Sequence, residues 1–218
     1  MTEADWLNCT DPKPMLEFVR RIGSERKLRL FGVAVSRQFR DQLDLQAIAD
    51  GLETAERYAD TRKTKSALKR ARQELKTIRH GIPGGDRTRV VEWVALWLAE
   101  VVASENAFGG VGADVVRLAS LGLIGPDKPT SMVELMSCIF GSLPFNPVSL
   151  DLPHLAPPLV SLAQTIYDDR AFGRMLELAV ALERAGCHDT ELLAHCRGPG
   201  PHVRGCWVLD LILGRSSP

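Results

Sequence analysis

The chain has 218 residues, of which 45% are hydrophobic and 25% are charged, and its formal net charge is zero. These are ordinary values for a globular protein and they argue against wholesale disorder. A chain of this length can bury a sizeable core, as one large or two small domains.

The zero net charge hides a difference between the two ends of the chain. Residues 1–90 contain 19 Lys and Arg against 13 Asp and Glu, a net charge of +6, and residues 91–218 contain 8 against 14, a net charge of −6. Such a split can mark a nucleic-acid-binding arm or two parts that dock on each other. For a neutral chain we favour docking.

The N-terminus has early acidic residues and lacks the apolar core of a secretory signal. The most apolar window, residues 90–102, is interrupted by Glu92 and Glu100 and is shorter than the roughly 20 apolar residues that span a bilayer. Five cysteines, an odd number, without a signal peptide indicate reduced thiols. We therefore expect a soluble, cytoplasmic protein with no membrane partner.

The spacing of apolar residues predicts helices along almost the whole chain and therefore an all-α fold, with a helical bundle over residues 1–140. Asp11 and Pro12 suit the start of one helix, because proline lacks an N–H that a first turn does not need, and Ser24 suits the N-cap of the next. After a short segment around Trp6, the expected helices span about 12–22, 25–39, 45–59, 64–79, 87–103, 114–121 and 131–140. The helix over 87–103 is apolar around nearly its whole circumference, which is typical of the buried centre of a bundle.

The bundle is followed by a proline-rich stretch over residues 141–158, which we expect to run extended across a surface. Residues 159–218 are predicted to form a helical hairpin and a terminal capping helix, packed as one unit with the bundle. The hairpin helices are expected over 159–167 and 171–184, and Gly186 suits the end of the second helix.

A basic stripe follows the helix over residues 62–79, because its cations recur at steps of three and four. Such a stripe can track the phosphates of a nucleic acid. An acidic stripe on the preceding helix (Asp50, Glu53, Glu56 and Asp60) offers an alternative in which both faces are paired or solvated, and we favour it because no aromatic residue interleaves with the cations. The candidate nucleic-acid-binding residues are Arg62, Lys65, Lys69, Arg72, Lys76 and Arg79.

Cysteine and histidine gather in the C-terminal segment from Cys187 to Trp207. Zinc prefers four such ligands in a tetrahedron, and His202 and Cys206 would face the same way on a helix that starts at Pro201. The candidate ligands are Cys187, His195, Cys196, His202 and Cys206. Because no C-x₂-C pair is present, a metal-free cap with buried cysteines is the favoured alternative, and a Cys–His nucleophilic site is a third.

The two ends of the chain resemble an uncharacterised bacterial family found as many paralogues in planctomycete-type genomes. The resemblance covers residues 1–43, which begin MTEADWL, and residues 138–214, which include HCRGPGPHVRGCW. Members typically carry a Cys-Cys pair and a His in the second helix, where this chain has Val33, Ala34, Val35 and Ser36. The resemblance implies a shared fold and a shared terminal segment, and it implies no reaction.

We therefore expect a non-catalytic helical module for protein interaction or regulation, with an unidentified protein partner, because the sequence shows no convergent catalytic set or cofactor motif. The alternative is a zinc-binding domain, structural or catalytic, built on the C-terminal Cys/His segment. Nucleic-acid binding through the basic helix comes third, and an enzyme is less favoured than a non-enzyme.

Overall fold

The computed structural model describes residues 1–40, 46–82, 90–103, 132–141, 145 and 156–215. Within these ranges the regular structure is helical, so the predicted all-α fold is confirmed. The α-helices are α1 (Glu3–Leu7), α2 (Pro12–Ile22), α3 (Glu25–Arg40), α4 (Gln46–Thr61), α5 (Lys65–His80), α6 (Val90–Val102), α8 (Met132–Phe140), α9 (Pro157–Asp168), α10 (Met175–Arg184), α11 (Thr190–Arg197) and α12 (Trp207–Ile212), and a short 3₁₀ helix, η3 (Phe172–Arg174), precedes α10.

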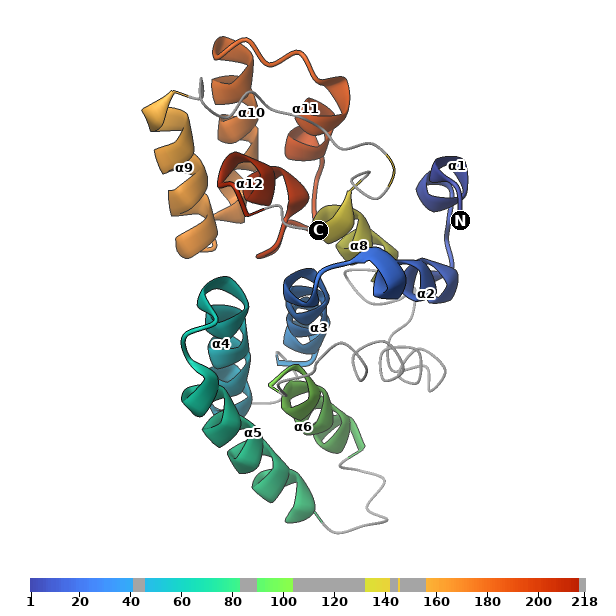
Figure 1. The fold of residues 1–218 in the computed structure, drawn as a ribbon, viewed down its shortest axis with the longest axis vertical. Helices are drawn as coiled ribbons and strands as arrows, with labels where there is room; N and C mark the ends of the chain where they lie inside the picture. Colours follow the sequence, from blue (N-terminus) through green and yellow to red (C-terminus); the bar gives the residue numbers. More distant parts are fainter. Residues whose placement is uncertain (41–45, 83–89, 104–131, 142–144, 146–155, 216–218) are drawn as a thin grey trace.

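The helices form two groups, each with its own apolar core (Figure 1). In the N-terminal group α3 packs against α4, α6 and α8, and α5 packs against α4 and α6. In the C-terminal group α9 packs against α10 and α12, and α11 packs against α10. Helix α8 lies where the groups meet, because its Cys138 belongs to the second core while its neighbour Ile139 belongs to the first. None of the described helices is both long and apolar enough to cross a membrane.

Several helix starts follow from polar caps that the sequence predicts. The side chain of Asp11 accepts a hydrogen bond from the N–H of Lys13, with Pro12 in the first turn of α2. Ser24 accepts from the N–H of Lys27 at the start of α3, and Asp189 accepts from the N–H of Leu192 at the start of α11. Each cap satisfies an N–H that has no partner within its helix.

Helix α6 lies against α3, α4 and α5. Leu96, Leu98, Ala99 and Val102 are fully buried, and Trp97 and Val101 are partly buried. Glu100 is buried too, and it forms an ion pair with Arg79 of α5 at 2.9 Å. This apolar helix therefore also carries a carboxylate that is held by a cation of the neighbouring helix.

The proline-rich stretch ends earlier than predicted. Pro157 and Pro158 are the first two residues of α9, because proline at these positions lacks only an N–H that the first turn leaves unused. Residues 142–144 and 146–155 of this stretch lie outside the described residues, as does the expected helix over 114–121.

The terminal helix starts later than predicted, at Trp207 instead of Pro201. The Gly200–Pro201 peptide is cis, and Gly200 and Gly205 have φ of +92° and +88°. A left-handed backbone at these two glycines cannot belong to a right-handed helix. His202 and Cys206 therefore do not share a helical face, since residues 198–206 form an irregular connection between α11 and α12.

A buried ion cluster joins the two helical groups. Asp210 of α12 has no solvent exposure and accepts hydrogen bonds from Arg26 of α3 at 2.7 and 2.9 Å. Lys27 lies 2.7 Å from the same carboxylate. Arg26 also pairs with Asp60 of α4, and the hydroxyl of Tyr167 on α9 donates to Asp60 at 2.8 Å. Buried charges require such partners, so these contacts restrict how the two groups can sit against each other.

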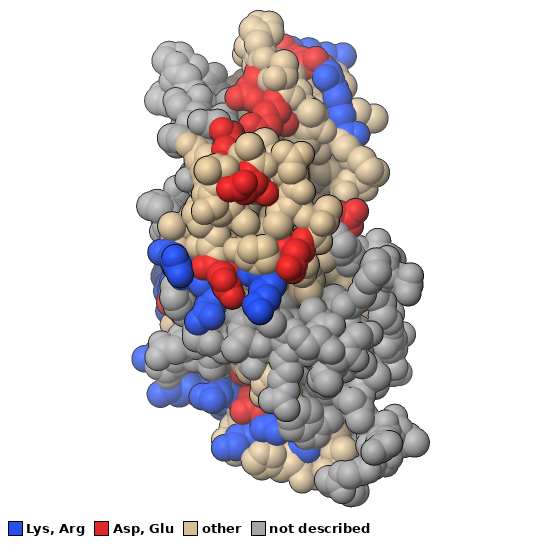
Figure 2. Space-filling view, turned by 90° about the vertical axis from the view of Figure 1, so that its right-hand side faces the viewer, with Lys and Arg blue, Asp and Glu red and all other residues tan. Residues whose placement is uncertain are grey.

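A second set of ion pairs crosses the same junction around Glu56 of α4. Its carboxylate pairs with Arg37 of α3, with Arg170, which follows α9, and with Arg204, which precedes α12. Two members of the predicted acidic stripe, Glu56 and Asp60, thus face the C-terminal group and not the basic stripe of α5. On the face shown in Figure 2, most Asp and Glu side chains lie in the upper half of the molecule and most Lys and Arg side chains lie lower down.

Replacement of Asp210 by Ala should lower the free energy of unfolding by about 3–5 kcal/mol, because it leaves two buried cations without their shared counter-ion. Urea unfolding followed by circular dichroism measures this change. Glu53→Ala is the matched control: it removes a carboxylate from an ion pair with Arg57 in which both side chains are more than half exposed, and it should cost less than about 1 kcal/mol. A loss of less than about 1 kcal/mol for Asp210→Ala would contradict the role given to the cluster.

Candidate metal centre

Four potential metal ligands meet at the junction of the two helical groups. They are Cys138 of α8, His195 of α11, His202 of the connection that follows, and Cys206, the residue before α12. Their ligand atoms all lie within 4.8 Å of one another. A tetrahedral zinc ion with Zn–S of about 2.3 Å and Zn–N of about 2.0–2.1 Å places its ligand atoms about 3.3–3.8 Å apart. The most widely separated ligand atoms would have to approach by about 1–1.5 Å to reach the spacing of a tetrahedral site.

The side chains are packed closely around this point. Nε2 of His195 lies 3.2 Å from Sγ of Cys206. The rings of His195 and His202 meet edge to face with centroids 4.9 Å apart, and the Trp207 ring lies 5.5 Å from that of His195. Both cysteines are buried and both histidines are half-buried. The group thus sits at the edge of the core, with its sulfur atoms on the inner side.

His202 shows the clearest need for a ligand. Both of its ring nitrogens are buried, and neither forms a hydrogen bond of normal geometry among the described residues, although the ring lies close enough to Cys206 to lower the pKa of that thiol. A buried polar atom without a partner costs about 1–3 kcal/mol, so such atoms are rare in native proteins. A metal ion bound between His202 and the other three side chains would give one of these nitrogens a strong partner.

The pKa values of the two buried thiols are shifted in opposite directions. Burial raises the pKa of Cys206, but its contacts with Cys138, His195 and His202 outweigh this and hold the pKa well below its usual value. The contact with Cys206, together with burial, raises the pKa of Cys138 well above its usual value. The pair therefore holds one negative charge readily, and it is the thiolate form of cysteine that binds metals.

A close contact between α8 and α12 brings the cysteines together. Gly141 ends α8 with a φ of +53°, and a Cβ atom added there would lie 2.6 Å from Cγ of Trp207. Only a glycine allows the backbone of residue 141 to lie directly on the indole ring. Because Cys138 is one turn before Gly141 and Cys206 precedes Trp207, this contact places the two sulfur atoms side by side.

The structure brings together three of the five metal ligands predicted from the sequence, namely His195, His202 and Cys206. Cys187 and Cys196 are not members of the group. Cys196 follows His195 on α11, so its side chain points about 100° further around the helix and packs into the apolar core of the C-terminal group. Cys187 lies after α10 and packs at the margin of the same core.

Cys138 is the potential ligand that is not predicted from the sequence. It lies in an apolar helix among Met136, Ile139 and Phe140, where a cysteine is most simply explained as a small core residue. No local spacing links it to the terminal segment, because the two are joined only by tertiary packing. The sequence signal that points to Cys138 is only that it is one of the two cysteines outside the segment from Cys187 to Trp207.

The candidate nucleic-acid-binding residues lie on or next to α5. Arg62 follows α4 and forms an ion pair with Glu25, and Arg72 and Arg79 both reach Glu100 of α6. Lys65, Lys69 and Lys76 are exposed. The stripe is therefore partly neutralised by the acidic residues beside it, and nucleic-acid binding stays a prediction.

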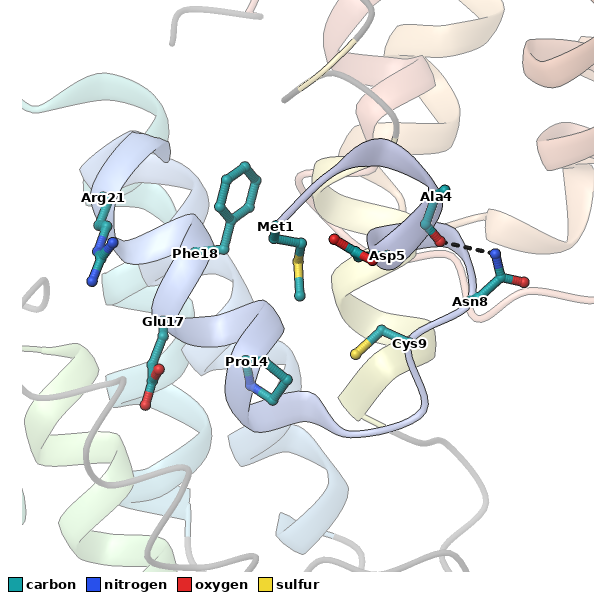
Figure 3. Close-up of a pocket in the computed structure, with 9 residues that line it drawn as sticks. All are labelled: Met1, Ala4, Asp5, Asn8, Cys9, Pro14, Glu17, Phe18 and Arg21. Atoms are coloured by element: carbon teal, nitrogen blue, oxygen red, sulfur yellow. Dashed lines mark hydrogen bonds between the residues drawn. The ribbon is translucent and has the colours of Figure 1, made fainter.

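A cavity of about 800 Å³ lies between α1 and α2 (Figure 3). Its lining includes Met1, Phe18 and Cys9, and the Cys9 thiol donates to the carbonyl of Asp11. Asp5, which also lines it, is engaged as part of the cap of α1, where its carboxylate accepts from the N–H of Thr2. The polar groups named here thus serve local turns, and they do not converge on a shared point as the four metal ligands do.

Comparison of the chain with protein-family models, with curated proteins and with solved structures gives no match. The resemblance to a planctomycete-type family stays a prediction. Any functional proposal for this protein therefore rests on the geometry of the site.

Cys196 should react slowly with alkylating agents, because burial raises its pKa to about 12. A raised pKa keeps the thiol protonated: at pH 8 only about one molecule in ten thousand carries the reactive thiolate. We expect labelling of the partly exposed Cys9 and Cys187 well before Cys196, and a rise in Cys196 labelling of about tenfold per pH unit while the fold persists. Peptide mass spectrometry measures each rate, and equal rates for Cys187 and Cys196 in the folded protein would refute the buried placement of Cys196.

Proposed function

We propose that the protein binds one zinc ion through Cys138, His195, His202 and Cys206, and that the ion fastens the C-terminal helices to the N-terminal bundle. The observation that carries this proposal is the convergence of four ligand atoms within 4.8 Å, one of them from a histidine whose buried ring nitrogens form no hydrogen bond with any described residue. A set of two sulfur and two nitrogen donors is one of the combinations that hold tetrahedral structural zinc in proteins.

The number of ligands favours a structural role for the metal over a catalytic one. Structural zinc sites have four protein ligands, whereas catalytic sites keep three and leave a position open for water or substrate. Here four side chains converge, and both cysteines are buried. Zinc held in this way contributes to folding, because the site exists only when the chain segments that carry the ligands have come together.

The metal would connect distant parts of the sequence. Cys138 belongs to the helix that packs on α2 and α3, and the other three ligands belong to the segment that leads from α11 into α12. One ion would thus cross-link the two helical groups at the point where their cores meet. This arrangement suits a rigid, non-catalytic helical module, and the interaction or regulatory role expected from the sequence stays a prediction.

The protein purified without added chelator should contain one zinc ion per chain by elemental analysis. Chelation should then destabilise the fold: at a free zinc concentration a thousand times Kd the bound ion contributes about 4 kcal/mol, which corresponds to a fall in Tm of about 8–16 °C for a chain of this size. Differential scanning calorimetry with and without chelator measures this shift.

Variants of neighbouring cysteines provide the control. Cys138→Ser should lose stoichiometric zinc and the sensitivity of Tm to chelator, whereas Cys196→Ser and Cys187→Ser should keep both. Metal-free protein whose Tm does not respond to chelator or to added zinc would sink the proposal. Equal loss of zinc in Cys138→Ser and Cys196→Ser would show that the ligand set is a different one.

A further inference from the structure

Lys27 of α3 lies buried between the two segments that carry the cysteine ligands. Its ammonium donates to the carbonyl of Ile139 and to the carbonyl of Gly205, both at 2.8 Å. Ile139 directly follows Cys138, and Gly205 directly precedes Cys206. One side chain therefore holds the backbone beside each of the two cysteines.

The three N–H groups of the ammonium are matched by three acceptors. Two of these are the carbonyls, and the third is Asp210, whose carboxylate lies 2.7 Å away. Asp210 stands one turn after Cys206 on α12, and its N–H donates to the carbonyl of Cys206. The cation is thus fixed on all sides, and its position sets the separation of the two cysteine-bearing backbones.

The two acceptor carbonyls, those of Ile139 and Gly205, lie where regular helical hydrogen bonding does not supply a donor. Ile139 lies in the last turn of α8, where carbonyls have no partner further along the helix, and Gly205 lies in the irregular connection before α12. Buried carbonyls in such places are costly when left without a donor. Lys27 meets this need at both sites with one ammonium group.

We propose that Lys27 is a positioning residue of the metal centre, holding Cys138 and Cys206 at the separation that a tetrahedral ion requires. This inference rests on the proposed zinc site. Lys27 acts through the backbone of the ligands and does not touch the metal. Partners of this kind, outside the ligands themselves, typically change metal affinity by about 10–100-fold when they are removed.

The neighbouring Arg26 forms its own bonds to Asp210, so Lys27 can be replaced while Asp210 keeps a partner. Arg26 holds Asp210 through two hydrogen bonds and also reaches Asp60 and Tyr167. In Lys27→Met the Asp210 carboxylate would keep both bonds from Arg26, so no buried charge would be left without a partner. The variant removes the donors to the two carbonyls and preserves the length of the side chain.

The test is a titration of the metal-free protein with Co²⁺ and then with competing Zn²⁺. Tetrahedral cobalt bound by two sulfur and two nitrogen atoms gives visible absorption bands that report the geometry of the ligands. We expect Lys27→Met to bind both metals about 10–100-fold more weakly than the unaltered protein and to shift the cobalt bands. Lys27→Arg, whose guanidinium can still donate to the carbonyls, should recover part of the affinity.

Leu75→Ala is the matched control, because Leu75 is fully buried on α5 and packs within the bundle away from the ligands. It should lower the Tm of the protein, because it leaves a cavity in the core, and leave the metal affinity and the cobalt bands of the folded protein unchanged. If Lys27→Met does not fold, Lys27→Gln replaces it: its side chain is shorter and its two N–H groups cannot serve all three acceptors of the ammonium, so metal binding should again weaken.

Affinity and bands equal to those of the unaltered protein in Lys27→Met would overturn the role of Lys27 and leave the zinc site standing. An equal weakening in Leu75→Ala would also overturn it, since the effect would then follow stability alone. Failure of the unaltered protein to bind cobalt or zinc would instead refute the site itself and the inference with it.

Discussion

The structure depends most on the buried contact between Asp210 and the adjacent cations Arg26 and Lys27. A carboxylate with no solvent exposure must be paired, so α12 can dock only where both cations of α3 reach it. Through Lys27 the same contact fixes the carbonyls of Ile139 and Gly205, and these residues adjoin the two cysteines of the metal centre. The geometry of the proposed zinc site is in this sense a consequence of how one ion pair joins the two helical groups.

The buried ion pairs and the proposed zinc ion have complementary effects on the junction of the two helical groups. The ion pairs are directional and specify how the helical groups meet, but buried ion pairs contribute little net stability because desolvation offsets much of their attraction. A zinc ion bound by Cys138, His195, His202 and Cys206 would add stability at the same junction without altering the orientation. A protein with two modest cores and an irregular terminal connection benefits from such a cross-link, because the connection over residues 198–206 has no regular backbone hydrogen bonding of its own.

Much of the fold could be predicted from the sequence, because apolar stripes and caps such as Asp11, Ser24 and Asp189 are local signals. The prediction of a helix from Pro201 onward was wrong, because the i,i+4 spacing of His202 and Cys206 imitates a helix although Gly200 and Gly205 oppose one. The site was predicted only in part, because only some of its residues are local in sequence. His195, His202 and Cys206 are near one another in sequence, whereas Cys138 joins them only through tertiary packing. Cys196 is excluded from the site because it follows His195 on α11, and a step of one residue along the helix turns its side chain into the apolar core.

The ligand set itself is the central claim, and X-ray absorption spectroscopy of the zinc-bound protein tests it most directly. We predict a first coordination sphere of two sulfur atoms at about 2.3 Å and two nitrogen atoms at about 2.0–2.1 Å, with the multiple-scattering signal of two imidazole rings. A sphere of three or four sulfur atoms would bring Cys187 or Cys196 into the site. A sphere without sulfur would contradict the account altogether.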